Sequence, residues 1–334
     1  MSYDVFSLGD LPLQSGQVLP DAQLAYKTYG TLNADRSNAV LLPTFYTGTH
    51  ERNEGFFGTD RAINPDRHFI VSINMFGNGL SSSPSNTVAP ADRGNFPLVT
   101  LYDNVKCQKT LLQSLFDIEK LLLVTGWSVA GCQAFQWASQ FPDCVSNAVP
   151  FCASARVSPH NWLFLEGVKT ALLADPTFND GFYTQAPESG LKAFATVYAG
   201  WAYSQTWYRD AGYKQLGFQN IGELLRSWEQ DHLTWEANDL LAKLATWQNA
   251  DISQNGLYQG DLKAALGSVS ANTIIIACDD DLYFQPADNE REVAHLQYGE
   301  LRIYESPWGH CVASPGNDPK FHDFLDQSIS DLID

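Results

Sequence analysis

The segment Val124-Thr125-Gly126-Trp127-Ser128-Val129-Ala130-Gly131 indicates how the chain folds around one serine. The apolar run Leu121–Thr125 leads into it and is typical of a buried strand, whereas Val129–Phe141 places apolar residues at helical spacing. A serine between a strand and a helix, with small residues two positions away on either side, is typical of a tight turn that exposes a nucleophilic hydroxyl. The second small residue is Ala130 rather than glycine, which adds one methyl group and should leave the turn intact. We therefore expect Ser128 to occupy such a turn, where free helix N–H groups face developing negative charge.

Further apolar runs on both sides of this segment predict a sheet. These runs are Ala39–Pro43, His68–Asn74, Val145–Phe151, Thr273–Cys278 and Leu301–Tyr304. Continuous rather than alternating apolar runs fit strands that are buried on both faces, as in a mostly parallel sheet. Helical stretches such as Asn104–Phe116 separate them, so we expect an α/β architecture with right-handed crossovers and helices on both faces. The chain up to about residue 27 looks like an antiparallel start.

The region from residue 158 to residue 262 interrupts this alternation. It contains no convincing strand, and its helical stretches are Asn161–Leu173, Gly190–Ala202, Ile221–Trp228 and Glu236–Trp247. It also holds six of the nine tryptophans, at positions 162, 201, 207, 228, 235 and 247. A connection this long with its own helices is better interpreted as an inserted cap than as a loop. We expect a core of residues 1–157 and 263–334 and a helical cap of residues 158–262. Most of its aromatic side chains should pack, and a few should line an apolar cavity.

Composition excludes several classes of protein. The 334 residues are 44% hydrophobic and 17% charged, which is typical of a folded rather than a disordered chain. Acidic residues outnumber basic ones 38 to 20, and the formal net charge of −18 disfavours binding to nucleic acid or to anionic membranes. The start of the chain has no pattern of an export signal, and no apolar run approaches the ~18–20 residues that span a bilayer. We expect a cytoplasmic protein.

Cysteines and acidic residues do not indicate a metal site. The six cysteines, at positions 107, 132, 144, 152, 278 and 311, are dispersed and form no Cys-x-x-Cys pair. This spacing disfavours both a disulfide framework and a zinc site. The acidic run Asp279–Asp281 lacks the spaced carboxylates and the glycine of a calcium-binding loop. We expect neither a metal nor a cofactor.

A base and an acid for Ser128 are found near the end of the chain. A nucleophilic serine needs a base, and the base needs a carboxylate that orients it. The predicted strand Thr273–Cys278 runs into Asp279–Asp281, and carboxyl ends of parallel strands are where chemistry gathers in open α/β sheets. His310 follows the last predicted strand, and the alternative bases are His50 and His160. The residues alone leave open which of the three aspartates would pair with the base.

Two backbone N–H groups should stabilise the oxyanion that forms when the serine attacks a carbonyl group. One is expected from Val129, directly after the serine, and the other from the loop after Ala39–Pro43. Tyr46 is our choice in that loop, and Phe45 replaces it if the register differs by one residue. The glycine-rich loop at residues 77–79 is interpreted as structural, because a phosphate-binding pattern is incomplete there.

Several separate segments, in order along the chain, resemble the homoserine O-acetyltransferase family of α/β-hydrolases. They are Asn95–Thr100, Asp103–Leu115, Gly126–Gln133, Ala153–Arg156, Ala171–Pro176, Asp281–Phe284 and Ser306–His310. The resemblance extends from about residue 11 to the C-terminal helix and includes the helical insertion, which caps the active site in that family. It implies that Ser128 is the nucleophile, His310 the base and Asp281 its partner. It also implies that Tyr46 and Val129 supply the oxyanion-hole amides.

Differences from the transferases favour the ester-hydrolase members of the family. The transferases usually have an acidic residue directly after the catalytic histidine, whereas this chain has Cys311, which cannot pair with an ammonium group unless it is ionised. The turn reads Ser-Val-Ala-Gly rather than Ser-Met-Gly-Gly. The segments Ser158–Asn161, Phe164–Gly167 and Trp308–His310 also look more similar to the hydrolases.

Together these observations predict a serine hydrolase that cleaves a small to medium, largely apolar carboxylic ester through an acyl-enzyme. Phe45, Trp127, Trp162 and Cys311 are expected to line its substrate pocket. One alternative is an O-acyltransferase that moves an acyl group from acyl-CoA to an alcohol, although the negative net charge weakly disfavours that anionic donor. The other alternative is a non-catalytic ligand-binding protein on the same fold. The expected partner is a small-molecule ester, and a homodimer is left open.

Overall fold

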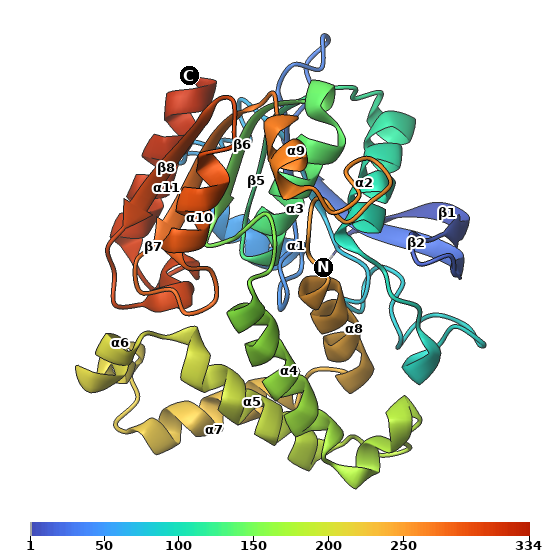
Figure 1. Cartoon of the computed structure of the whole chain (residues 1–334), viewed down its shortest axis with the longest axis vertical. Coiled ribbons are helices and arrows are strands. Elements are labelled where there is room, and N and C mark those ends of the chain that lie inside the picture. Colours follow the sequence, from blue (N-terminus) through green and yellow to red (C-terminus); the bar gives the residue numbers. More distant parts are fainter. Residues whose placement is uncertain (1) are drawn as a thin grey trace.

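One eight-stranded sheet organises residues 2–334, which are the residues that the computed structural model describes (Figure 1). Its strands lie in the order β1-β2-β4-β3-β5-β6-β7-β8. The first two strands are antiparallel to each other, β2 is antiparallel to β4, and the strands from β3 to β8 run parallel. The bounds are β1 Asp4–Pro12, β2 Val18–Tyr29, β3 Ala39–Pro43, β4 Phe69–Ile73, β5 Leu121–Trp127, β6 Val145–Phe151, β7 Asn272–Cys278 and β8 Gly299–Tyr304.

Helices cover both faces of the sheet, as predicted. All five residues of β3 are buried, and they alternate between two clusters of core residues. Leu41 packs with residues of α2 and α3, whereas Leu42 belongs to the cluster that contains Phe321 of α11. The helices of the core are α1 His50–Asn53, α2 Leu101–Phe116, α3 Val129–Gln140, α9 Leu262–Gly267, α10 Pro286–Val293 and α11 Pro319–Ile333. The mostly parallel α/β architecture expected from the apolar runs is therefore confirmed.

The other helices gather at one end of the sheet, in the lower part of Figure 1. They follow β6 and precede β7, with bounds α4 Pro159–Leu173, α5 Glu188–Ala202, α6 Gln205–Arg209, α7 Ile221–His232 and α8 Ala237–Gln248. The chain after α8 returns to the core, where Ile252 packs with Phe135 and the Tyr258 hydroxyl donates a 2.7 Å hydrogen bond to the carbonyl of Ser139. We propose that the cap comprises residues 158–248 and that the segment up to residue 262 belongs with the core.

Several predicted boundaries differ from the structure by a few residues, and pairing and packing explain two of these differences. Strand β5 extends to Trp127 rather than Thr125, because Gly126 and Trp127 continue the parallel pairing with β6. Helix α7 extends to His232 rather than Trp228, because His232 is buried and continues its apolar face. Both extensions place the end of an element at the pocket described below.

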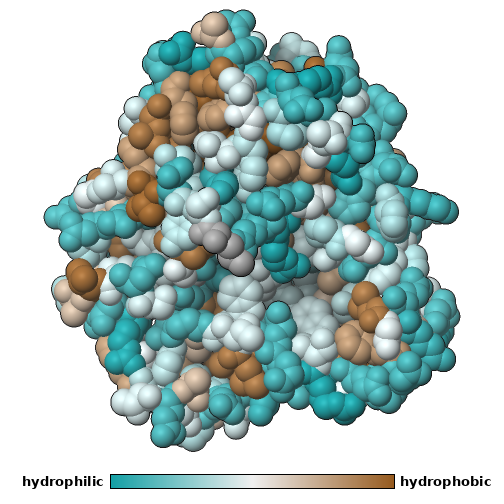
Figure 2. All heavy atoms as spheres, turned by 180° about the vertical axis from the view of Figure 1, so that it is seen from behind, coloured by the Kyte–Doolittle hydropathy of each residue, from teal (hydrophilic) through white to brown (hydrophobic). Residues whose placement is uncertain are grey.

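Three further findings concern the surface, the helices and the cysteine residues of the chain. Hydrophilic residues cover most of the face shown in Figure 2, and hydrophobic residues form separate patches on it. Within residues 2–334, no helix combines the length and the apolar character needed to cross a membrane. All six cysteines are free thiols.

Candidate active site

The turn at Ser128 joins the end of β5 to the start of α3. Ser128 has a φ of 60° and a ψ of −129°, a backbone conformation that is rare for residues other than glycine. Its N–H donates to the carbonyl of Phe151 at 3.0 Å, and its own carbonyl accepts from the N–H of Cys132 at 3.0 Å. Two backbone hydrogen bonds thus hold the serine in a strained conformation, and its side chain lines a pocket.

Close packing explains how the turn accepts Ala130. A Cβ atom on Gly126 would lie 2.5 Å from the Cβ of Ala130, so the two positions have room for one methyl group between them. A Cβ atom on Gly131 would lie 2.5 Å from the Cβ of Ala153 and 2.8 Å from the carbonyl oxygen of Gly126. The small residues are therefore needed for the close approach of α3 to the strand ends, which is the steric reason inferred from the sequence.

Asp281 is the aspartate of the three that meets His310. Its Oδ2 lies 2.8 Å from Nδ1 of His310, and the carboxylate is fully buried. Its Oδ1 accepts hydrogen bonds from the backbone N–H groups of Tyr283 at 2.7 Å and Phe284 at 3.2 Å. The neighbouring carboxylate of Asp279 instead accepts from the N–H of Ser306 at 2.9 Å. An Nδ1–H that donates to Asp281 leaves Nε2 of His310 free to accept a proton.

Aromatic rings surround the imidazole of His310. The ring of Trp127 stacks on it at 5.2 Å between centroids, and the ring of Tyr283 lies at 4.4 Å. The alternative bases lie elsewhere: Nδ1 of His50 is 3.1 Å from the side-chain amide of Asn74, and His160 is exposed with its ring 5.0 Å from that of Trp201. His310 and Ser128 line the same pocket, whereas neither alternative histidine does.

The two expected oxyanion donors lie in different elements of the core. Val129 is the first residue of α3, and Tyr46 lies in the loop after β3. Neither backbone N–H donates a hydrogen bond to another group within residues 2–334. The loop is anchored by Thr44, whose N–H donates to the carbonyl of Ile73 at 3.1 Å and whose hydroxyl accepts from the N–H of Met75 at 3.0 Å.

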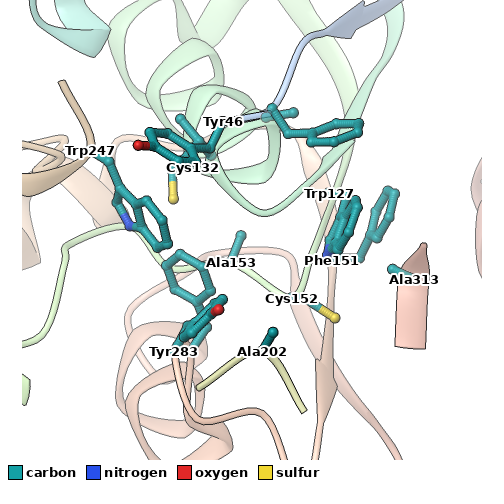
Figure 3. Packing of buried hydrophobic residues seen from close by; sticks show 14 of the residues in the cluster. Tyr46, Trp127, Cys132, Phe151, Cys152, Ala153, Ala202, Trp247, Tyr283 and Ala313 are labelled. Carbon is teal, nitrogen blue, oxygen red and sulfur yellow. The ribbon is translucent and has the colours of Figure 1, made fainter. Parts of the chain in front are cut away.

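A pocket of about 270 Å³ opens between the core and the cap, with Ser128 and His310 in its wall. Figure 3 shows Tyr46 and Tyr283 on one side of this region and Trp127 on the other. Its wall combines aromatic and polar side chains, and besides Ser128, His310, Tyr46 and Tyr283 the lining residues include Phe45, Trp127, Tyr198, Tyr203, Trp228 and Cys311. The predicted pocket residues Phe45, Trp127 and Cys311 are thus brought together.

The fourth predicted pocket residue, Trp162, lies outside the pocket, so that prediction is corrected. Trp162 is 44% exposed to solvent. Helix α4 is oriented so that Trp162 and Leu163 face solvent and Phe164 faces inward. The ring of Phe164 stacks on Tyr283 at 4.8 Å between centroids. Phe164, two positions after Trp162, is therefore the aromatic residue of α4 that lies near the site.

Polar residues at the pocket mouth were missed by the sequence analysis. Arg52 of α1 and Asp231 of α7 line the pocket, and both side chains are exposed to solvent. The Arg52 guanidinium lies 5.1 Å above the ring of Phe45 and donates to Thr47. Among the lining residues within 2–334, Arg52 is the single lysine or arginine. No sequence pattern distinguished these two charges from ordinary surface residues.

Cys311 lies directly after His310 and is a neutral group in this site. Burial, and next the nearby Asp281 carboxylate, raise the pKa of its thiol to about 12. The thiol is therefore protonated near pH 7. It offers no negative charge to an ammonium group, as the comparison with the transferases indicated.

A family model described as the α/β hydrolase fold matches residues 40–314. The chain belongs to this family of proteins. It is 37% identical over 313 residues to a probable esterase from Corynebacterium glutamicum, a match that covers 92% of this chain and 89% of the relative. It is 34% identical to an ethyl acetate hydrolase from Pseudomonas veronii, with 99% of this chain and 95% of the relative covered.

The solved structures agree with these relatives. The structure of an acetylester hydrolase from Corynebacterium glutamicum superposes with a TM-score of 0.95 at 34% identity, and the match covers 99% of this chain and 96% of that one.

A homoserine O-acetyltransferase from Nostoc punctiforme is 29% identical in sequence over 89% of this chain and 88% of its own length. The predicted placement, nearer to the ester hydrolases than to the transferases, is confirmed.

Proposed function

We propose that this carboxylic ester hydrolase cleaves short acyl esters of small alcohols, with Ser128 as nucleophile, His310 as base and Asp281 as the orienting acid. The observation that supports it best is the buried 2.8 Å contact between Asp281 and His310, in a pocket that His310 shares with the strained serine. The relatives named for ethyl acetate and acetyl esters support a short acyl group.

The first half of the reaction forms an acyl-enzyme. Nε2 of His310 takes the proton of the Ser128 hydroxyl while its oxygen attacks the ester carbonyl carbon. The negative charge on the carbonyl oxygen is stabilised by the N–H groups of Val129 and Tyr46. The C–O bond to the alcohol then breaks, and the alcohol leaves with the proton that His310 held. Asp281 stabilises the imidazolium between these two transfers.

The second half returns the enzyme to its starting state. His310 takes a proton from water, whose oxygen attacks the acyl carbon and forms a second tetrahedral intermediate at the same N–H groups. The bond to Ser128 breaks, the serine recovers its proton, and the carboxylic acid leaves. Each step is a proton transfer or an acyl transfer that residues of this chain and water supply.

The pocket supports a substrate with an apolar part and a polar end. The aromatic wall near His310, including Trp127 and Tyr283, suits a short acyl chain and a small alkyl group. Arg52 and Asp231 at the mouth would meet the end of the alcohol portion. We therefore expect small neutral esters to be the preferred substrates. We also expect the pocket to accept longer alcohol portions that carry a polar end.

Ser128→Ala tests the proposal directly. Turnover of short acyl esters should fall by about 10⁴-fold or more, and a fluorophosphonate should no longer label the protein. Ser139→Ala is the matched control, because that serine lies on the same helix and its hydroxyl bonds the distant carbonyl of Ala265. Ser139→Ala should keep turnover and labelling. Unchanged turnover in Ser128→Ala would contradict the mechanism.

Acyl transfer to an alcohol shares this machinery and is the alternative that the assay must separate. A panel of esters that vary in acyl and alcohol length, run with and without acetyl-CoA and alcohol acceptors, distinguishes the two reactions. We expect hydrolysis to dominate, because Cys311 provides no charge for an amino alcohol and Arg52 is a single cation near the mouth. Dominant CoA-dependent transfer would reverse this ranking.

A further inference from the structure

Helix α8 of the cap contacts the side chain of Tyr46 in three ways. The Tyr46 hydroxyl donates a 3.0 Å hydrogen bond to the carbonyl oxygen of Leu240. Its ring lies 5.6 Å from the ring of Trp247, and Nζ of Lys243 lies 5.4 Å from the ring centroid. Figure 3 shows Tyr46 and Trp247 side by side. The residue expected to provide an oxyanion N–H is therefore fixed by the cap rather than by the core alone.

Lys243 is an unusual member of this contact. Its side chain is fully buried, and its Nζ forms no hydrogen bond within residues 2–334. Besides the ring of Tyr46, the ammonium faces the ring of Trp235, whose centroid is 4.5 Å from Nζ. Burying an ammonium group without a hydrogen-bond partner is costly, so lysines are rarely found in such positions. Two aromatic faces and the charge of nearby Asp239 stabilise this ammonium.

The carboxylates near Lys243 are engaged with other groups. Asp239, one turn earlier on α8, accepts from the hydroxyl of Ser85 at 2.7 Å and from its N–H at 3.0 Å. Glu236 accepts from the N–H of Asp239 at 2.7 Å, and burial raises the pKa of Glu236 to about 7. His232 at the end of α7 is buried, and its pKa is lowered by burial and, to a smaller extent, by Lys243. Asp239 and His232 interact with the charge of the ammonium, and the ring of Tyr46 lies against it.

We propose that Lys243 is a positioning residue for the oxyanion hole: its ammonium, held between Trp235 and Tyr46, fixes the Tyr46 ring and with it the Tyr46 backbone N–H. The inference rests on the proposed function, because that function assigns this N–H to the oxyanion. Lys243 does not line the pocket and does not touch substrate. Its effect should therefore appear in kcat rather than in KM, since the oxyanion exists only along the reaction path.

A pH dependence follows from the chemistry of the contact. An ammonium is attracted to aromatic faces, whereas a neutral amine is not. Burial lowers the pKa of Lys243 to about 8, and Asp239 acts in the opposite direction. Raising the pH through about 8 should remove the charge, loosen Tyr46 and reduce kcat. Near pH 7 the charge is present and the contact with Tyr46 is intact.

The experiment compares kcat and KM of the wild-type protein and Lys243→Met between pH 7 and pH 10, on one neutral ester. Wild-type kcat should fall about fivefold across this range with KM unchanged. Lys243→Met, which is similar in shape and uncharged, should have a low kcat at every pH that equals the wild-type value at high pH. Lys169→Met removes another cap lysine, which pairs with Glu166 on the surface, and should keep the wild-type profile.

Two results would overturn the inference. One is a wild-type kcat that stays level through pH 8, a measurement that needs no variant and remains decisive if Lys243→Met fails to fold. The other is an alkaline decline that persists in folded Lys243→Met. Ser128→Ala keeps this test separate from the proposed function: if that variant is inactive and the wild-type profile is level, the role of Lys243 alone is wrong.

Discussion

The turn at Ser128 and the loop at Tyr46 face the same pocket, but they are held in different ways. The turn is made by consecutive residues of one strand and one helix, and its shape depends on contacts such as that between Gly126 and Ala130. The loop is anchored in the core by Thr44, and its Tyr46 side chain also contacts α8, a helix far away in the sequence, through Leu240 and Lys243. The proposed nucleophile is therefore held mainly by its own strand–helix turn and the neighbouring strand, whereas the proposed oxyanion donor also depends on packing against the cap.

This difference predicts that core substitutions near the turn act on all substrates and on folding, whereas substitutions at the cap and mouth adjust rates and selectivity. The following four variants test that division, beginning with the largest effect.

Asp281→Asn should reduce kcat by about 10⁴-fold with little loss of folded protein, because an amide in place of the carboxylate favours the wrong tautomer of His310. The measurement is kcat for a short ester together with thermal unfolding. Asp279→Asn is the matched control, since its side-chain oxygen can still accept from the N–H of Ser306. If Asp279→Asn were as inactive as Asp281→Asn, activity would depend on the whole acidic loop rather than on one carboxylate.

Gly126→Ala should lower the free energy of unfolding by about 2–3 kcal/mol and remove most activity, because its new methyl group would overlap that of Ala130. Denaturant unfolding measures the loss. Ala130→Gly alone should remain active, and the double variant should recover part of the stability, since the backbone of residue 130 would still be 2.9 Å from the new Cβ. Equal stability of the single and double Gly126→Ala variants would contradict the proposed clash.

Glu292→Gln should remove a pH dependence of stability that belongs to the core beside the turn. Glu292 is buried, accepts from the N–H of Ala155 at 2.8 Å and from the side chain of Asn289 at 2.8 Å, and burial raises its pKa to about 8. The unfolded chain loses this proton near pH 4.5, so the free energy of unfolding should fall between about pH 5 and pH 8, by on the order of 3–4 kcal/mol. Chemical denaturation at both pH values measures this change, and an equal fall in Glu292→Gln would contradict the assignment.

Arg52→Gln should have the smallest effect and the most selective one. For neutral short esters, kcat and KM should stay within about twofold, because the guanidinium is at the mouth rather than at the reacting atoms. For esters with a negative group on the alcohol, KM should rise about fivefold through loss of the positive charge. Arg209→Gln on α6 is a control outside the pocket. A large fall in kcat for neutral esters would show that the mouth is not separable from the catalytic groups.

The turn at Ser128 and the strands around it could be predicted from the sequence. The apolar runs predicted six strands along the chain, and the positions of Ser128, Asp281 and His310 after predicted strand ends placed them at one edge of a parallel sheet. Pairing of Asp281 rather than Asp279 with His310 was an implication of the family resemblance. The three-dimensional reason is visible only in the fold, where the N–H groups of Tyr283 and Phe284 orient the Asp281 carboxylate.

The pocket and the contacts of the Tyr46 loop depend on how the cap packs. The sequence alone does not show this packing. Trp162 was expected in the pocket because aromatic residues are abundant in the cap, yet the rotation of α4 decides which side chain faces inward. Arg52 and Asp231 come from elements far apart in the chain and look like solvated charges when each is viewed alone. For Lys243 a sequence feature did exist: it shares a helical face with the apolar residues Leu240 and Trp247.

The insertion of the cap between β6 and β7 also separates the parts of the site in time. During synthesis, the strand and helix that present Ser128 emerge first, then the whole cap, and only afterwards the segments with Asp281 and His310. A nascent chain can therefore form the turn without a base to activate it. If the proposed triad is right, ester hydrolysis should begin only when β8 and the loop with His310 have been made, so activity reports more than collapse of the first half of the chain.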